Sequence, residues 1–256
     1  MRILVTFAVD AEFAPWRKLR DLQTTMIDGM EVFHAQIGRA AVDFVVTGMG
    51  IENAMRSTSA VLTEAHSFCI TTGFAGALHQ HLHVGNIVVA ESVQLLGKPT
   101  TLHSSRGLVS HAQQDGALRA KLLLTSNHIV RTPGEKAQLA PFAEFVDMES
   151  FGVFQAASKA RRPAVAIRVI SDSHDAGIPK DVELTMDQRG RILFGKVARY
   201  LAKYPAHLPA LIRLGRDSRT AAQALAAFLE AYIKKISFLT HGWFPEGQNL
   251  EQVASR

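Results

Sequence analysis

The sequence is poor in cysteine and aromatic residues and has no long hydrophobic run. It contains a single cysteine, Cys69, so no internal disulfide can form. This residue lies between Phe68 and Ile70, where we expect a buried thiol without a catalytic role. No apolar run approaches the roughly 20 residues that a membrane-spanning helix needs, and the chain passes from Met1 directly into a strand-like run instead of a signal peptide. We therefore expect a cytoplasmic protein.

The charge of the chain is basic but dispersed. The 28 lysines and arginines exceed the 23 aspartates and glutamates, which gives a formal net charge of +5. Because the basic residues are scattered and aromatic residues are sparse, we expect no nucleic-acid partner. The same charge suits an anionic substrate or a membrane surface. The densest basic stretch, residues 196–219, alternates Arg and Lys with apolar residues, which is typical of the solvated faces of amphipathic helices.

The order of apolar patterns predicts an α/β protein. Short apolar runs alternate with helical patterns over most of the chain, which favours one domain with a sheet covered by helices on both faces. We expect a helical C-terminal extension from about residue 193, because Leu225, Phe228, Leu229 and Tyr232 are spaced as on one face of a helix. The predicted strands are 3–8, 43–47, 68–72, 86–95, 122–125, 145–147 and 164–170, and the other predicted helices are 11–22, 51–64 and 150–160.

Two glycine-containing turns follow predicted strands. Gly48, Met49 and Gly50 lie between a strand and a helix, where backbone N–H groups can bind an anion or a sugar. They do not form the dinucleotide-binding fingerprint, because the third glycine is replaced by Asn53. Residues 73–76, Gly-Phe-Ala-Gly, repeat the arrangement after the next strand. Either turn alone is equally consistent with close packing of a helix on the sheet, but the pair indicates a ligand crevice.

Acidic residues and a methionine lie where the strand 145–147 meets a helix. A carboxylate such as Glu149 can accept hydrogen bonds from two neighbouring ribose hydroxyls, and the thioether of Met148 can pack against the sugar ring. The alternative is that Asp147 and Glu149 only complement the dipole of the following helix.

Further acids lie at the ends of two other strands. Ser171 and Asp172 end the buried run 167–172, at the sheet edge where α/β proteins bind ligands. An acid there can give a proton to a ring nitrogen of a departing base, although capping of the next turn is an alternative role for Asp172. Glu12 follows the first strand and faces the same edge, where it can activate a water or, alternatively, only complement a helix dipole.

In their order and spacing, these segments resemble the family of nucleoside phosphorylases and nucleosidases. That family includes purine nucleoside phosphorylases, methylthioadenosine/adenosylhomocysteine nucleosidases, futalosine hydrolases and hopanoid-associated nucleoside phosphorylases. The resemblance spans about residues 2–175. It rests on Glu12, Thr47–Gly50 with Asn53 and Ala54, Gly73–Ala77, Val84–Asn86, Asp147–Ser150, Arg168 and Ser171–Asp172.

The resemblance implies a single domain with a central mixed, twisted sheet, a small-molecule nucleoside substrate and a homodimer. It implies no cofactor and no metal, with phosphate as co-substrate if the enzyme is a phosphorylase. Met148 and Glu149 would bind ribose, and Asp172 would protonate or hydrogen-bond the purine N7 with Ser171 nearby. Glu12 and Arg168 would position the nucleophile. The other implied substrate-binding residues are Gly48, Gly73, Phe74, Ile129 and Val130.

Two features distinguish this chain within the family. Phe74 stands where typical adenosylhomocysteine nucleosidases have serine, which makes the pocket more apolar. Residues 132–136 and 208–217 look most like the hopanoid-associated branch, whose substrate would be an adenosylated hopane. We therefore expect an adenine nucleoside with a large hydrophobic 5′ group. The alternatives are a methylthioadenosine/adenosylhomocysteine nucleosidase, a futalosine hydrolase, or a nucleoside-binding protein without catalysis.

The attacking nucleophile is either phosphate or water. Glu12 would repel a phosphate dianion, whereas the branch that the chain resembles is named for phosphorolysis. Arg39, Arg131 and Arg168 are candidate phosphate ligands if they converge. On balance we expect phosphorolysis.

Two further segments suggest additional contacts. His79, His81 and His83 alternate in a manner that can ligate zinc or copper, although no second ligand cluster accompanies them. Residues 208–216 combine leucine and isoleucine with arginine, which predicts contact with an anionic membrane. Co-sedimentation with anionic vesicles at low salt tests this membrane contact, and failure to co-sediment would count against it.

Overall fold

The computed structural model describes residues 1–180, 182, 187 and 193–239. Their strands form one sheet, and the predicted α/β fold with helices on both faces of a mixed sheet is confirmed. The strands are β1 (Arg2–Phe7), β2 (Gln23–Ile27), β3 (Met30–Ile37), β4 (Ala40–Val46), β5 (Phe68–Ala77), β6 (Ile87–Leu95), β7 (Thr101–His103), β8 (Leu118–Thr125), β9 (Phe145–Asp147) and β10 (Ala164–Asp172). The helices are α1 (Asp10–Leu19), α2 (Ile51–Val61), α3 (Arg106–Gln114), α4 (Pro133–Leu139), α5 (Ser150–Lys159), α6 (Phe194–Lys203) and α7 (Leu208–Ile236), with a 3-10 turn at Pro205–His207.

The centre of the sheet is parallel. Strand β1 pairs in parallel with β4 and β5, and β5 pairs in parallel with β10. Beyond β5 the strands close on themselves, because β10 pairs with β6, β6 with β8, β8 with β9, and β9 again with β5. Although β9 is antiparallel to β5, residues at or just after the carboxyl ends of β1, β5, β8, β9 and β10 line one common cavity.

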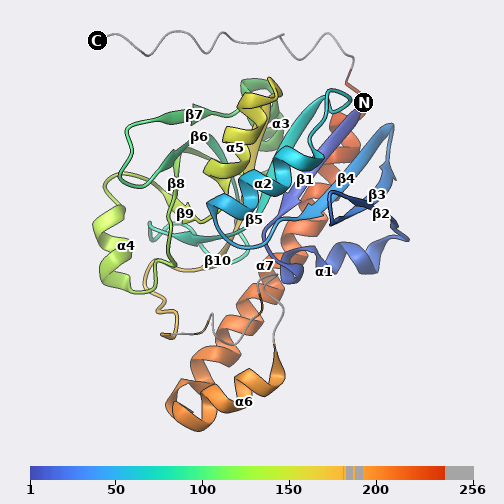
Figure 1. Ribbon diagram of the computed structural model, residues 1–256. Coiled ribbons are helices and arrows are strands. Elements are labelled where there is room, and N and C mark those ends of the chain that lie inside the picture. The colour runs from blue at the N-terminus through green and yellow to red at the C-terminus, as the bar shows by residue number, and fades with distance from the viewer. Residues whose placement is uncertain (181, 183–186, 188–192, 240–256) are drawn as a thin grey trace.

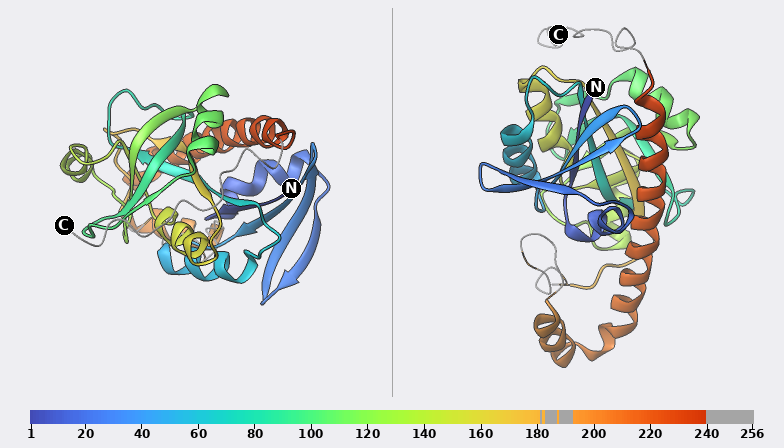
Figure 2. Two further views of the ribbon diagram at one scale, coloured as in Figure 1. Left: turned by 90° about the horizontal axis from the view of Figure 1, so that it is seen from above. Right: turned by 90° about the vertical axis from the view of Figure 1, so that its right-hand side faces the viewer.

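Helices cover the two faces of the sheet and bury separate apolar cores (Figure 2). Alternate residues of β1 point to opposite faces, so Ile3 and Val5 pack against α1, α3 and α7, whereas Leu4 lies in the core beneath α2 and α5. Cys69 belongs to this second core, and its predicted burial is confirmed. Burial raises the pKa of its thiol, which keeps it unreactive.

The last described helix, α7, has two differently placed parts. Its C-terminal half packs against the sheet through residues such as Leu225, Leu229 and Tyr232. Its N-terminal half extends past the sheet and carries α6 beside it (Figure 1). Leu208 and Ile212 on the extending part are 46% and 63% exposed. No helix among the described residues is long and apolar enough to cross a membrane, and the expected contact of this segment with a membrane surface stays a prediction.

Candidate active site

A cavity of about 1160 Å³ opens at the carboxyl ends of the central strands. Backbone and side chains from the ends of β1, β5, β8, β9 and β10 form its inner wall, and α1 and α7 form its outer part. Parallel strands present unpaired backbone groups and short loops at this edge, which is why ligands of α/β folds bind there. The wall residues at the strand ends are Ala8, Val9, Glu12, Met49, Phe74, Ala75, Gly76, His128, Ile129, Val130, Val146, Asp147, Met148, Glu149, Ser171 and Asp172.

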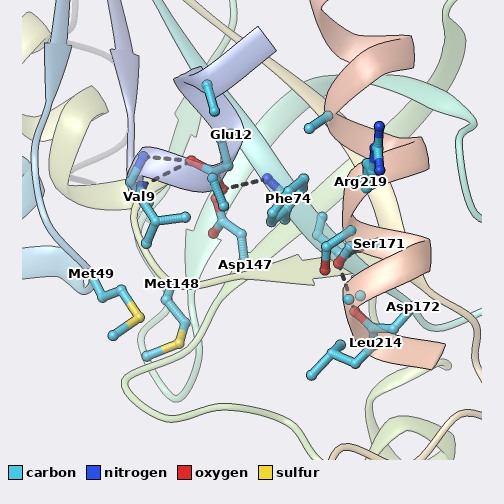
Figure 3. Close-up of a pocket in the computed structure, with 18 of the residues that line it drawn as sticks. Val9, Glu12, Met49, Phe74, Asp147, Met148, Ser171, Asp172, Leu214 and Arg219 are labelled. Carbon is cyan, nitrogen blue, oxygen red and sulfur yellow. Dashed lines mark hydrogen bonds between the residues drawn. The ribbon is translucent and has the colours of Figure 1, made fainter. Parts of the chain in front are cut away.

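Glu12 is held rigidly at the inner wall. One carboxylate oxygen accepts hydrogen bonds from the backbone N–H groups of Ala8 (2.7 Å) and Val9 (3.1 Å). The other accepts from Phe74 N–H of strand β5 (2.7 Å). Figure 3 shows these bonds from the turn after β1 and from β5 converging on the carboxylate. The side chain is 3% exposed and reaches the cavity.

Gly73 leaves the space that this carboxylate occupies. A Cβ at position 73 would lie 2.5 Å from Oε1 of Glu12, and the backbone there has a φ of +132°, which side chains rarely adopt. Gly73 itself is absent from the cavity wall. Its function is therefore to admit Glu12, whereas the sequence suggested a direct contact with substrate.

The segment after β9 supplies two more acids and a methionine. Asp147 accepts hydrogen bonds from Thr125 Oγ1 (2.7 Å) and from the backbone N–H of Ser150 (3.1 Å), so it caps α5. Glu149 accepts a hydrogen bond from Gly50 N–H (2.9 Å), at the start of α2. The sequence suggested that backbone N–H groups of this turn bind an anion or a sugar, but the N–H of Gly50 instead bonds to Glu149. Met148 lies beside Met49 at the cavity wall, with both thioethers on the same side of the site (Figure 3).

Arg168 lies behind this wall and does not line the cavity. Its guanidinium is fully buried, forms an ion pair with Asp147 (2.7 Å), and donates to Thr72 O (2.8 Å), Thr71 Oγ1 (3.0 Å) and Ser150 Oγ (2.9 Å). A guanidinium has five N–H donors in a fixed plane, and these bonds use most of them. Arg168 therefore braces Asp147 and β5, and it acts on the cavity through its charge.

The pKa values of two acids of the wall, Glu12 and Glu149, are raised. Burial is the largest cause of the raised pKa of Glu12, and the charge of Arg168 and three backbone hydrogen bonds oppose it. Burial, followed by the neighbouring Asp147, raises the pKa of Glu149 to about 8. Both causes favour the protonated form of Glu149, whereas positive charge on a bound sugar would favour its ionised form.

The opposite side of the wall carries Ser171 and Asp172, at the end of β10. Ser171 Oγ donates to Asp172 Oδ1 (2.9 Å), as Figure 3 shows, and the second oxygen of Asp172 accepts a hydrogen bond from Nζ of Lys136 on α4. Because β5 pairs with both β1 and β10, Phe74 lies between Glu12 and this pair. A planar base bound beside Phe74 would have a carboxylate on each side.

The outer part of the cavity is an apolar groove along α7. Lining residues recur on one face of this helix from Leu211 to Glu230, a span of roughly 29 Å at 1.5 Å per residue. The opposite side of the groove is formed by Ala11, Ala14 and Pro15 of α1. The α7 residues that line the groove are Leu211, Leu214, Gly215, Ser218, Arg219, Ala222, Gln223, Ala226, Ala227 and Glu230.

Most of the sequence-predicted site residues come together at the cavity. Glu12, Phe74, Ile129, Val130, Met148, Glu149, Ser171 and Asp172 all line it, whereas Gly48, Gly73 and Arg168 lie behind its wall. Lys136 and the α7 groove were not predicted from the sequence.

The three candidate phosphate ligands do not converge at the cavity. Arg39 lies beside Phe238 with its backbone N–H on Ser237, Arg131 is not part of the cavity wall, and Arg168 is paired with Asp147. The condition under which they were candidate phosphate ligands, that they converge, is therefore not met.

Two of the three alternating histidines lie side by side, with the ring centroids of His79 and His81 5.6 Å apart. His79 bonds to the carbonyl of Ala140 (2.9 Å), His81 is exposed, and the backbone N–H of His83 bonds to Asn86. In the part of the chain that the structure describes, no group of three or more His, Cys, Asp or Glu residues could hold a metal ion.

Comparisons with known proteins agree with this geometry. The family model described as the phosphorylase superfamily matches residues 2–203. A 5′-methylthioadenosine/S-adenosylhomocysteine nucleosidase of Bacillus thuringiensis is 27% identical over 198 residues, which cover 67% of this chain and 86% of that protein. The enzyme of the same name from Neisseria meningitidis, solved with methylthio-immucillin-A, aligns with a TM-score of 0.70 and 19% identity over 91% of this chain and 99% of that chain. Futalosine hydrolase of Helicobacter pylori aligns with a TM-score of 0.70 and 16% identity over 92% and 98% of the two chains.

Proposed function

Since this chain belongs to the phosphorylase superfamily, we propose that it hydrolyses the N-glycosidic bond of an adenine nucleoside that carries a large apolar 5′ group. The chain is an enzyme that cleaves nucleosides, as its family implies. The proposal adds three points: water is the nucleophile, adenine is the base, and the α7 groove binds the 5′ group.

The arrangement of acids is the observation that carries the proposal. Glu12, Asp147 and Glu149 line one side of the cavity, and Asp172 lines the other. Cleavage of a glycosidic bond develops positive charge on the sugar and negative charge on the leaving base. Carboxylates near the sugar stabilise the first charge, and an acid near the base neutralises the second.

The same acids argue for water instead of phosphate as the nucleophile. A phosphate dianion beside Glu12 would also lie near the acids Asp147 and Glu149, and the backbone N–H of Gly50, which could otherwise bind it, is already bonded to Glu149. Among the described residues that line the cavity, the lysine is Lys18 on α1 and the arginine is Arg219 on α7. Both belong to the outer groove and not to the inner wall that carries Glu12. We therefore replace the expectation of phosphorolysis with hydrolysis, in which Glu12 accepts a proton from the attacking water.

Departure of the base completes the reaction. Adenine leaves poorly as an anion, so a proton delivered to N7 lowers the barrier while the bond between C1′ and N9 breaks. Asp172 supplies that proton, and Ser171 holds its carboxyl group in place through the 2.9 Å hydrogen bond. Release of free adenine and a reducing sugar in phosphate-free buffer tests this reaction.

The α7 groove favours an elongated apolar 5′ substituent. It continues outward from the sugar-binding wall and is lined largely by alanine, leucine and glycine. An alkyl chain buried there gains about 0.8 kcal/mol for each CH₂ group removed from water. An adenosylated hopane, which the sequence resemblance suggested, is one substrate of this shape and stays a prediction, as does the expected homodimer.

Replacing Ser218 with phenylalanine tests the groove. Ser218 is half-buried and lines it, so Ser218→Phe should lower kcat/KM for 5′-octylthioadenosine at least about tenfold, because excluding even two CH₂ groups costs more than a tenfold factor. Turnover of methylthioadenosine should change less than about threefold. Thr220→Phe is the matched control, because Thr220 is exposed on the same helix outside the groove. Equal losses for both substrates would exclude the groove as the 5′ site.

A further inference from the structure

A buried lysine lies directly behind the acid that faces the base. Lys136, on α4, is fully buried and does not line the cavity. Its Nζ donates a hydrogen bond to Oδ2 of Asp172 and another to the carbonyl of Ser173 (2.6 Å). Asp172 itself is about 10% exposed and does line the cavity. Any effect of Lys136 on the base must therefore pass through Asp172.

Stability alone does not explain this ion pair. Removing an ammonium and a carboxylate from water costs several kcal/mol for each ion, and apolar replacement of such pairs is often neutral or stabilising. The pair lies instead at the point where the proposed reaction needs a proton. The carboxylate of Asp172 accepts hydrogen bonds from Ser171 and from the ammonium of Lys136, so Lys136 is placed to hand a proton to it.

We propose that Lys136 is the source of the proton that Asp172 passes to N7, an inference that rests on the proposed function. One proton moves from Nζ of Lys136 to Oδ2 of Asp172 and from there to N7. Meanwhile the bond between C1′ and N9 breaks and its electron pair leaves with the base. Adenine departs neutral, Asp172 returns to its ionised form, and Lys136 is left neutral until it takes a proton from solvent. The attacking water adds to C1′ and gives its proton to Glu12.

A lysine can act as a proton source over a wider pH range than a carboxylic acid. A lysine ammonium ordinarily holds its proton to about pH 10, whereas an aspartic acid loses its proton near pH 4. Other titratable groups on the neighbouring segments are His128, Glu135, His174 and Asp175. The carboxylate of Glu135 is bonded to the backbone of Arg131 and Thr132, and His174 and Asp175 are exposed and paired with each other.

Replacing Lys136 with methionine tests the inference. At pH 8, Lys136→Met should lower kcat for methylthioadenosine by about 10²-fold, within the range of general-acid effects. The alkaline limb of its pH profile should move to lower pH, because Asp172 must then take its proton from solvent. Turnover of p-nitrophenyl riboside should fall less than about threefold, because nitrophenolate leaves without a proton. Lys98→Met, at an exposed position, is the matched control and should match the wild type.

Two further results separate proton supply from a structural role. Lys136→Arg keeps the positive charge but is a far weaker acid, so it should not restore kcat. Equal losses on both substrates, an unmoved alkaline limb, or rescue by arginine would overturn the inference while leaving hydrolysis by the wild type intact. A wild-type enzyme that releases no adenine would instead overturn the proposed function.

Discussion

Replacing Asp172 with asparagine should lower kcat by about 10²–10⁴-fold, because an amide cannot supply the proton that adenine needs as it leaves. Ser171 and Lys136 contact Asp172 from inside the protein, so KM should change little by comparison. Steady-state kinetics with methylthioadenosine measures both constants. If the variant keeps more than about a third of wild-type kcat, far above this range, Asp172 is not the acid.

The control for this variant must address stability. Asparagine leaves the buried ammonium of Lys136 without its carboxylate, and an unpaired buried charge is costly. The double variant Asp172→Asn, Lys136→Met removes both charges and should recover thermal stability without recovering kcat. Recovery of both would mean that the loss in the single variant came from unfolding.

Replacing Glu12 with glutamine should lower kcat by a comparable factor of about 10²–10⁴, because the attacking water then has no base. Glutamine has one oxygen where the carboxylate uses two to accept three backbone N–H groups, so some loss of stability is also expected. Gly73→Ala provides an independent test, because its Cβ would displace the carboxylate without removing it.

Azide distinguishes the functions of the two acids. It is a nucleophile that needs no base, so it should restore part of the activity of Glu12→Gln as a glycosyl azide product. It should not restore Asp172→Asn, which lacks a proton for the base. Equal rescue of the two variants would contradict the assignment of water activation to Glu12.

Local patterns in the sequence predicted the sheet edge well. Glu12 and Asp172 follow apolar runs that become β1 and β10, and β1, β5 and β10 are parallel, so their carboxyl ends lie at one edge. Glu149 reaches the same cavity although its strand, β9, is antiparallel to β5. The hairpin of β2 and β3 was missed because β2 is mostly exposed and lacks an apolar face. The sequence did contain a signal for this hairpin, because the pair Asp28-Gly29 favours a tight two-residue turn. In the structure these two residues have φ of 47° and 77°, as such a turn requires.

Other features depend on contacts between distant segments. The sequence placed Arg168 at the ligand, but in the structure it lies behind the wall, paired with Asp147, which is 21 positions away in the chain. Lys136 was not identified as a site residue from the sequence. Leu139 and Ala140 follow it by three and four residues, which places all three on the same face of a helix. Because Leu139 and Ala140 pack against an apolar cluster, this spacing was the sign that Lys136 faces inward. The α7 groove needs the helix to be placed against α1, which no local pattern specifies.

The identity of the sugar product tests the central claim most directly. Methylthioadenosine should be incubated with the enzyme in ¹⁸O-labelled water, with and without phosphate, and the products analysed by mass spectrometry. Hydrolysis by a Glu12-activated water predicts adenine and a free sugar with ¹⁸O at C1′, at a rate that phosphate does not raise. A sugar 1-phosphate formed only when phosphate is present would contradict it.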